Sequence, residues 1–116
     1  MTETSFWILT ALASGRRHGY AVLGDVNRLS AGSVALRVTT LYASLERLER
    51  DGCIRSAGDE VVDGRARRYY EILESGRVLL GAEAERLAAR AAAAQVSIAR
   101  GAAARLSPAP LTAVSV

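Results

Sequence analysis

The chain has 116 residues, half of them hydrophobic, which suffices for one domain with a modest core and excludes two independent catalytic domains. A single cysteine excludes an internal disulfide and a thiolate metal cluster, and no apolar run approaches the roughly 18 residues of a membrane span, so we expect a cytoplasmic protein with no cofactor, metal or membrane contact. All 15 basic residues are arginine, and the net charge of +3 permits a polyanionic partner without establishing one, because such fields act through their distribution.

Two short helices are predicted in the N-terminal part of the chain. Apolar residues recur at helical spacing over residues 5–13, and Gly15 then supplies a stop. A basic turn at residues 16–19 leads to a second apolar series, which starts at Tyr20 and predicts a helix to about Leu29.

The strongest helical stripe in the sequence lies over residues 38–51, before Gly52 ends it. The face expected to point inward consists of Leu41, Leu45 and Leu48. The face expected to point outward consists of Glu46, Arg47, Glu49 and Arg50. Either Thr39 or Thr40 is placed to cap the start of this third helix, because a threonine hydroxyl can accept from a free N–H group of the first turn.

A β-hairpin with a long tip is predicted next. Its strands cover residues 53–57 and 67–73, and the polar, glycine-containing loop between them covers residues 58–65. Cys53 is expected to fill core space as a small apolar side chain. Because side chains alternate along a strand, one of Tyr69 and Tyr70 is expected in the core and the other outside it.

One long helix is predicted over residues 75–106, because alanine, glutamate and arginine dominate this stretch and have high helix propensity. Apolar residues along it alternate four and three apart, which is the spacing of a coiled-coil seam, and small side chains would let a partner helix approach closely. The predicted dimer interface consists of Leu80, Ala84, Leu87, Ala91, Ala94 and Ile98. Residues 107–116 contain both prolines and are expected to form a disordered tail.

The order of helix, helix, helix, hairpin and long helix is typical of a winged helix-turn-helix protein. The expected fold class is therefore mainly α with a small β-hairpin and a long C-terminal dimerisation helix. We assign residues 1–74 to a DNA-binding domain, residues 75–106 to the dimerisation helix and residues 107–116 to the tail. In this topology the third helix enters the major groove of DNA by its N-terminal end, and the hairpin lies along the backbone or the minor groove.

Polar and basic side chains occupy the positions that would meet double-stranded DNA. The predicted contacts of the third helix are Arg37, Thr39, Thr40, Tyr42, Ala43 and Arg47, and those of the wing are Arg65, Arg67 and Arg68. Candidate phosphate contacts before the second helix are Arg16, Arg17 and His18, of which the histidine is otherwise expected to pack or cap locally. The acidic residues Asp59, Glu60 and Asp63 weaken the positive field of the wing.

Three motifs resemble the PadR family of bacterial transcriptional regulators over roughly residues 6–80. They are His18-Gly19-Tyr20; Thr40-Leu41-Tyr42 with Leu45, Leu48, Gly52 and Ile54; and Gly64-Arg65 with Arg67-Arg68-Tyr69-Tyr70 and Leu73. The resemblance implies a homodimer that binds an inverted-repeat operator as a repressor, with the single C-terminal helix of the family's shorter branch as dimerisation element. By position it places Thr40 and Tyr42 on the recognition helix and Arg65, Arg67 and Arg68 in the wing.

The chain departs from the family around the recognition helix and in the last helix. Family members commonly carry Ser-Pro-Gly before Thr-Leu-Tyr and a proline after it, whereas residues 36–39 read Leu-Arg-Val-Thr and Ala43 follows the tyrosine, so base contacts do not transfer. Some relatives bind planar aromatic ligands at the dimer interface, but the long helix here contains no aromatic residue. Phe6 and Trp7 form the candidate pocket for a small aromatic effector, and the alternative is that they pack the dimer core.

Two other classes of function stay open from the residues. A winged-helix interaction module without DNA binding is compatible with the acidic wing, and it would form a heteromeric complex and show no salt-sensitive binding to duplexes. A small enzyme or ligand carrier has little support, because the sequence holds no recognised catalytic or phosphate-binding motif. We therefore expect a regulator and not an enzyme.

Overall fold

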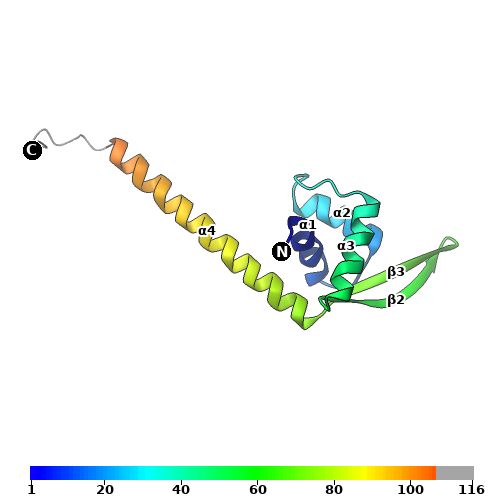
Figure 1. The fold of residues 1–116 in the computed structure, drawn as a ribbon. Coiled ribbons are helices and arrows are strands. Elements are labelled where there is room, and N and C mark those ends of the chain that lie inside the picture. The colour runs from blue at the N-terminus through cyan, green and yellow to red at the C-terminus, as the bar shows by residue number, and fades with distance from the viewer. Residues whose placement is uncertain (107–116) are drawn as a thin grey trace, which may run out of the picture. The chain divides into compact units, whose positions relative to one another are not determined.

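The computed structural model describes residues 1–106, and the predicted tail at residues 107–116 lies outside the described residues. This part of the chain contains four α-helices and a three-stranded antiparallel sheet (Figure 1). The elements are α1 (Glu3–Ala13), β1 (Arg17–His18), α2 (Gly19–Leu29), α3 (Val38–Arg50), β2 (Ile54–Val62), β3 (Arg65–Ile72) and α4 (Glu74–Leu106). The expected fold class, mainly α with a small hairpin and a long last helix, is confirmed.

The chain divides into a compact unit, Met1–Glu83, and a second unit that starts at Ala84 within α4. In the compact unit, α1, α2 and α3 gather at one end of the β2–β3 hairpin (Figure 1). The first turns of α4 belong to this unit. They are held there by Arg77, whose Nη1 donates to the carbonyl of Ala13 at 3.1 Å, and by Gly76, which is buried.

The core of the compact unit forms where the three short helices meet the base of the hairpin. The predicted stripe of α3 is confirmed, because its three leucines are at most 6% exposed, and each such side chain contributes about 1.5–3 kcal/mol by leaving water. The other core residues are Ile8, Leu9, Ala11, Leu12, Val22, Val26, Cys53, Ile54, Tyr70 and Ile72. Cys53 is thus the core filler expected of it, and burial raises the pKa of its thiol. Of the adjacent tyrosines, Tyr70 is the one in the core.

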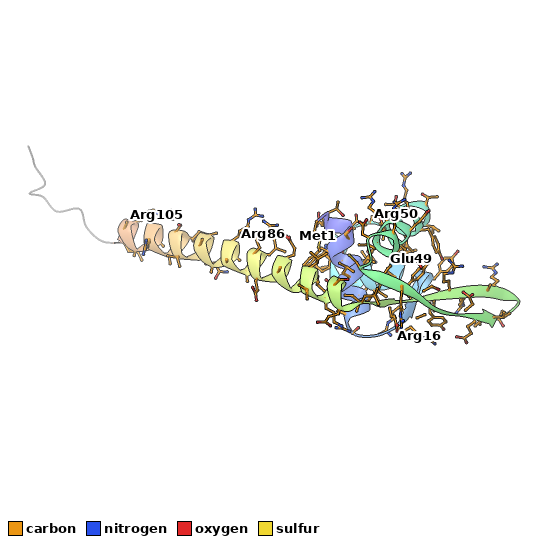
Figure 2. All side chains as sticks on the ribbon, turned by 60° about the horizontal axis from the view of Figure 1, so that its bottom comes forward. Met1, Arg16, Glu49, Arg50, Arg86 and Arg105 are labelled. Carbon is orange, nitrogen blue, oxygen red and sulfur yellow. The ribbon has the colours of Figure 1, made fainter. Side chains whose placement is uncertain are left out.

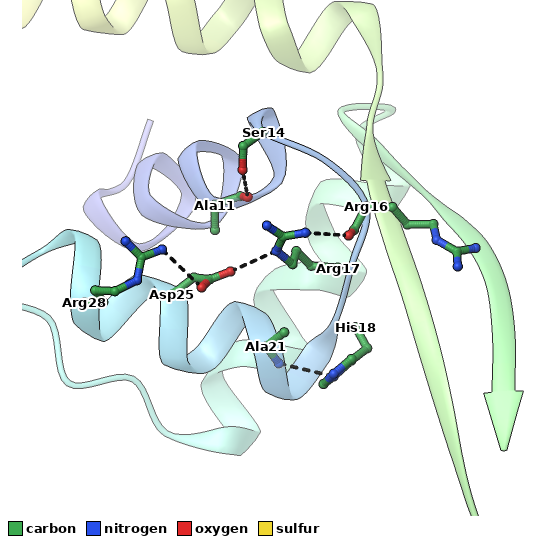
Figure 3. A network of polar contacts seen from close by, with 8 residues as sticks. All are labelled: Ala11, Ser14, Arg16, Arg17, His18, Ala21, Asp25 and Arg28. Carbon is green, nitrogen blue, oxygen red and sulfur yellow. Dashed lines mark hydrogen bonds and ion pairs between the residues drawn. The ribbon is translucent and has the colours of Figure 1, made fainter. Parts of the chain in front are cut away.

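Side chains cap the first two helices. The Oγ1 of Thr2 accepts from the N–H of Ser5 at 3.1 Å, and α1 therefore begins two residues before its predicted start. At α2, the Nδ1 of His18 accepts from the N–H of Ala21 at 3.2 Å (Figure 3). This hydrogen bond is the local capping role expected of His18.

The prediction of a threonine cap on α3 is wrong. Helix α3 begins at Val38 with Arg37 in the capping position, and no side chain caps it. The physical reason is that Arg37 is the last extended residue, with φ −82° and ψ 151°, so Thr39 and Thr40 already lie inside the first turn. The N–H groups of that turn are therefore left without a side-chain cap.

The predicted long loop of the hairpin is also wrong. Strand β2 continues to Val62 and β3 starts at Arg65, so only Asp63 and Gly64 connect them. Their φ angles of 52° and 75° are those of a type I′ turn, for which Asp-Gly is a preferred pair. No residue in the distal half of the hairpin is buried, and even Val61 is 73% exposed, so hydrophobic alternation gave no sign of a strand there.

The segment predicted as a basic turn contains a short strand. Residues Arg17 and His18 of β1 pair antiparallel with Tyr70 and Tyr69 of β3, which gives the sheet the order β1-β3-β2. A strand of two residues is too short to show a periodic pattern in the sequence, so it could not be predicted. It forms because it pairs with β3, which is distant along the chain. It joins the start of α2 directly to the wing.

Candidate nucleic-acid interface

The N-terminal half of α3 presents polar side chains to solvent. The predicted contacts Arg37, Thr39, Thr40, Tyr42 and Ala43 are all exposed, and the apolar Val38 among them is 41% exposed. Because no side chain caps α3, the N–H groups of its first turn are also available to an acceptor at the positive end of the helix dipole. This end of the helix can donate hydrogen bonds to phosphate oxygens and to base edges.

Tyr42 also determines how closely α2 and α3 approach each other. A β-carbon placed on Gly19 would lie 2.6 Å from the hydroxyl oxygen of Tyr42 and 3.0 Å from its Cζ atom. Residue 19 must therefore lack a side chain for the tyrosine ring to keep this position. Tyr42 is still 40% exposed, so it contacts α2 and is open to solvent at the same time.

Tyr20 is a surface residue that the sequence did not mark for a role in DNA contact. We placed it in the apolar series of α2, yet it is 57% exposed. It lines two hollows, one of about 450 Å³ with Arg65, Ala66 and Arg67 of β3, and one of about 570 Å³ that includes Leu36 and Arg37. Its place in the His-Gly-Tyr motif, directly after a basic turn, was the signal that could have indicated this.

Two of the three arginines of the wing lie opposite acidic residues. In the strand register Asp59 pairs with Arg68 and Glu60 with Arg67. The Nε of Arg68 lies 3.6 Å from Oδ1 of Asp59, and both side chains are more than half exposed, so the attraction between them is weak. Arg65 is exposed at the start of β3, directly after the turn at the tip of the wing.

The three candidate phosphate contacts before α2 all have partners within the chain. His18 caps α2, and Nε of Arg17 lies 3.3 Å from Oδ2 of Asp25, which also pairs with Arg28 (Figure 3). The Nη1 of Arg16 donates to the carbonyl of Ala57 at 2.8 Å. Each arginine still has further N–H donors, because a guanidinium carries five.

Arg47 lies apart from the other predicted contacts of α3. It lines a hollow of about 280 Å³ together with Met1 of the N-terminus and Leu79 of α4. Glu49 and Arg50 lie on the exposed side of the same helix (Figure 2). The structure therefore brings together the start of α3, Tyr20 and the wing, and it leaves Arg47 toward the other end of the helix.

The two aromatic residues of α1 form an edge-to-face pair. The ring centroids of Phe6 and Trp7 are 5.2 Å apart, with an angle of 82° between the ring planes. Trp7 packs against the hydrophobic core, and its Nε1 is buried without a hydrogen-bond partner among the described residues. This arrangement is compatible both with core packing and with a ligand site.

The part of α4 within the second unit is helical and exposed. Leu87 is 38% exposed, Val96 50% and Ile98 68%. Leu80 differs from the rest of the predicted seam, because it lies in the compact unit and packs against the hydrophobic core. The apolar seam beyond Ala84 is open along the single chain.

The described residues hold no metal-ligating cluster and no helix that could span a membrane. Within residues 1–106, no group of three or more His, Cys, Asp or Glu side chains could hold a metal ion. Across the same residues, no helix combines the length and apolar character needed to cross a bilayer.

Comparison with known sequences gives one family. The model of the family described as "Transcriptional regulator PadR-like family" matches residues 8–82. The transcriptional regulator Rv3488 of Mycobacterium tuberculosis is 42% identical over 74 residues, which cover 64% of this chain and 52% of that protein. An uncharacterized protein of Lysinibacillus sphaericus is 32% identical over 73 residues, which cover 63% of this chain and 67% of that one. The chain thus matches about half the length of the mycobacterial relative.

Solved structures share the fold. A PadR family transcription regulator from Clostridium difficile R20291 aligns with a TM-score of 0.69 at 19% identity, over 84% of this chain and 99% of the other. Bacillus subtilis PadR in complex with operator DNA aligns with a TM-score of 0.61 at 17% identity, over 99% of this chain and 54% of the other. Both have the winged helix with a C-terminal helix.

Proposed function

The chain belongs to the transcriptional regulator PadR-like family, whose members are regulators and not enzymes, and we propose that it is a cytoplasmic, homodimeric repressor that binds an inverted repeat in duplex DNA. The observation that carries the proposal is the hollow of about 450 Å³ in which Tyr20 of α2 lies with the wing arginines Arg65 and Arg67. A backbone phosphate in this hollow would meet one hydroxyl and two guanidinium groups, which are common phosphate donors.

The proposed contacts fall into two groups with different effects. At the start of α3, Arg37, Thr39, Thr40, Tyr42 and Ala43 would reach base edges and the phosphates beside them, with Arg47 further along the helix. In the wing, Arg65, Arg67 and Arg68 would contact phosphates, and Tyr20 would join them from α2. The first group would determine sequence preference, and the second would determine affinity and its dependence on salt.

Salt dependence of binding tests the wing directly. Each arginine that meets a phosphate releases condensed counterions and adds about 0.9 to the slope of log K against log salt concentration. Replacing Arg65, Arg67 and Arg68 by alanine should therefore flatten the slope by about 2 to 3 units and weaken binding to all sequences alike. An unchanged slope would contradict the wing assignment, and Arg100→Ala in α4 provides the control for the loss of one positive charge outside the compact unit.

The proposed dimer forms through α4. The seam residues Leu87 and Ile98 are exposed in the single chain, and a second copy of the helix would cover them. Alanine at most other seam positions permits close approach of the two helices. Sedimentation equilibrium should give a dimer, and a monomer at micromolar concentration would contradict this part of the proposal.

A small aromatic effector that releases the repressor is proposed at Phe6 and Trp7. The support is the edge-to-face pair and the buried Trp7 Nε1, which a ligand acceptor could satisfy. Trp7 is the only tryptophan, so its intrinsic fluorescence reports on this site alone. No change in fluorescence across a panel of phenols and planar aromatic compounds would leave core packing as the role of the pair.

The ion pair of the wing favours a second candidate function. Because Asp59 offsets the charge of Arg68, the hairpin presents less positive charge to DNA than its three arginines suggest. A reduced positive charge is expected of an interaction module that does not bind DNA. Such a module would show no salt-sensitive retention on duplexes and would purify with a different protein bound to α4.

A further inference from the structure

Arg16 is in contact with both strands of the wing. Its Cζ lies 4.2 Å from the centroid of the Tyr69 ring on β3, and its Nη1 donates to the carbonyl of Ala57 on β2 at 2.8 Å. Figure 3 shows its side chain extending from the link before β1 toward the strands. The residue thus joins the segment that leads into α2 to the two strands of the hairpin.

Ala57 lies at an irregular point of the hairpin. The register shifts between Ser56 and Asp59, so that Ala57 and Gly58 together lie opposite the single residue Tyr69 of β3, and Gly58 has a φ of 105°. An interruption of this kind bends a strand and increases its local twist. The direction of the distal hairpin, which carries Arg65 and Arg67, therefore depends on the geometry at this point.

Tyr69 is itself fixed from two other sides. The rings of His18 and Tyr69 are nearly perpendicular with centroids 5.6 Å apart, and the hydroxyl of Tyr69 donates to Oε2 of Glu60 at 2.6 Å. The hydrogen bond to Glu60 raises the pKa of the phenol, so the ring under Arg16 stays neutral at physiological pH. The face of a neutral phenol ring attracts a guanidinium group, so the contact between Arg16 and Tyr69 does not require an ionised tyrosine.

We propose that Arg16 is a positioning residue for DNA binding: it fixes the bend at residues 57–58 and so holds the wing arginines at the angle that meets phosphate, and it makes no phosphate contact of its own. The inference rests on the proposed function. A planar guanidinium is required, because the same group must stack on Tyr69 and reach the Ala57 carbonyl. Lysine carries the charge but has no planar group to stack.

A double-mutant cycle on the full chain tests this. Binding is measured to a duplex recovered by selection from random sequences on the wild-type protein. We expect Arg16→Met to weaken this binding about tenfold in the wild-type background, and less than twofold when Arg65 and Arg67 are already alanine, because contacting groups in one network are not additive. Its salt slope should fall by more than the value of about 0.9 expected for one lost phosphate contact. Arg28→Met is the matched control, because Arg28 is an exposed arginine of α2 whose ion pair is with Asp25.

The outcomes separate the two proposals. Equal effects of Arg16→Met in both backgrounds, or rescue of binding by Arg16→Lys, would show a direct phosphate contact and overturn the positioning role while DNA binding stands. Absence of salt-sensitive duplex binding by the wild-type protein would overturn the proposed function itself. If Arg16→Met lowers the melting temperature, binding is measured well below the melting temperature of every variant. Weak binding by Arg16→Lys, which keeps the charge, then reports the lost position of the wing and not unfolding.

Discussion

Replacing Gly76 by alanine should destabilise the compact unit, because there is no space for a side chain at the start of α4. A β-carbon at this position would clash with the carbonyl oxygen of Cys53 and lie 2.9 Å from Cγ1 of Ile72. The carbonyl cannot easily retreat, since it also accepts from the N–H of Leu73 at 2.9 Å. Overpacking of this kind costs about 1–3 kcal/mol, and the upper half of that range applies because a backbone atom must move.

The same helix provides a matched control. A β-carbon placed on Gly81 would meet no atom within 4 Å, so Gly81→Ala should stabilise the helix by about 0.5–1 kcal/mol. For a unit of this size, 1 kcal/mol corresponds to roughly 4–8 °C, and we expect Gly76→Ala to melt at least about 10 °C below Gly81→Ala. Thermal unfolding is followed by circular dichroism at one protein concentration, because dimerisation would make Tm depend on it. Equal melting temperatures would refute the packing of α4 against Cys53.

Three further outcomes are expected. Asp59→Asn should strengthen duplex binding to all sequences alike, because it removes a negative charge beside Arg68, and unchanged or weaker binding would show that this arginine does not meet phosphate. Tyr20→Phe should weaken duplex binding about three- to tenfold, the value of one lost hydrogen bond, without lowering Tm; unchanged affinity would remove Tyr20 from the interface. Because burial raises the pKa of Cys53, its thiol should react with a disulfide reagent at pH 8 far more slowly in the folded protein than in denaturant, and equal rates would contradict its place in the core.

The helical part of the fold could be predicted because burial leaves a periodic record in sequence. Leu41, Leu45 and Leu48 recur at the helical period, and each is buried in α3. The same reasoning placed Tyr20 in the apolar series of α2, although it is exposed. The first residue of an apolar series can lie at the surface although its side chain is largely hydrophobic. Tyr20 does so, and its ring carries a hydroxyl group that water can solvate.

The strands were harder to predict because they depend on distant partners. Strand β1 exists through its pairing with Tyr69 and Tyr70, which lie some 50 residues further along the chain. In the distal hairpin both faces meet water, so no alternation of apolar and polar residues marked the strands, and only the pair Asp63-Gly64 signalled a tight turn.

The residues of the candidate site could be predicted from the sequence, but most contacts between them could not. The arginines of the wing and the threonines of α3 were identified from the order of the elements, but the ion pair between Asp59 and Arg68 depends on strand register. The contacts of Arg16 depend in the same way on an interruption of β2, and the glycine that marks it, Gly58, is equally typical of a loop. Spacing along the chain does not contain this information.

Selection of random duplexes on the purified full-length protein, repeated at two salt concentrations, tests operator binding by a homodimer most directly. We predict enrichment of an inverted repeat whose half-site centres lie about one helical turn apart, with weaker retention at the higher salt concentration. Recovery of no common sequence, together with retention that does not change with salt, would contradict the proposed repressor.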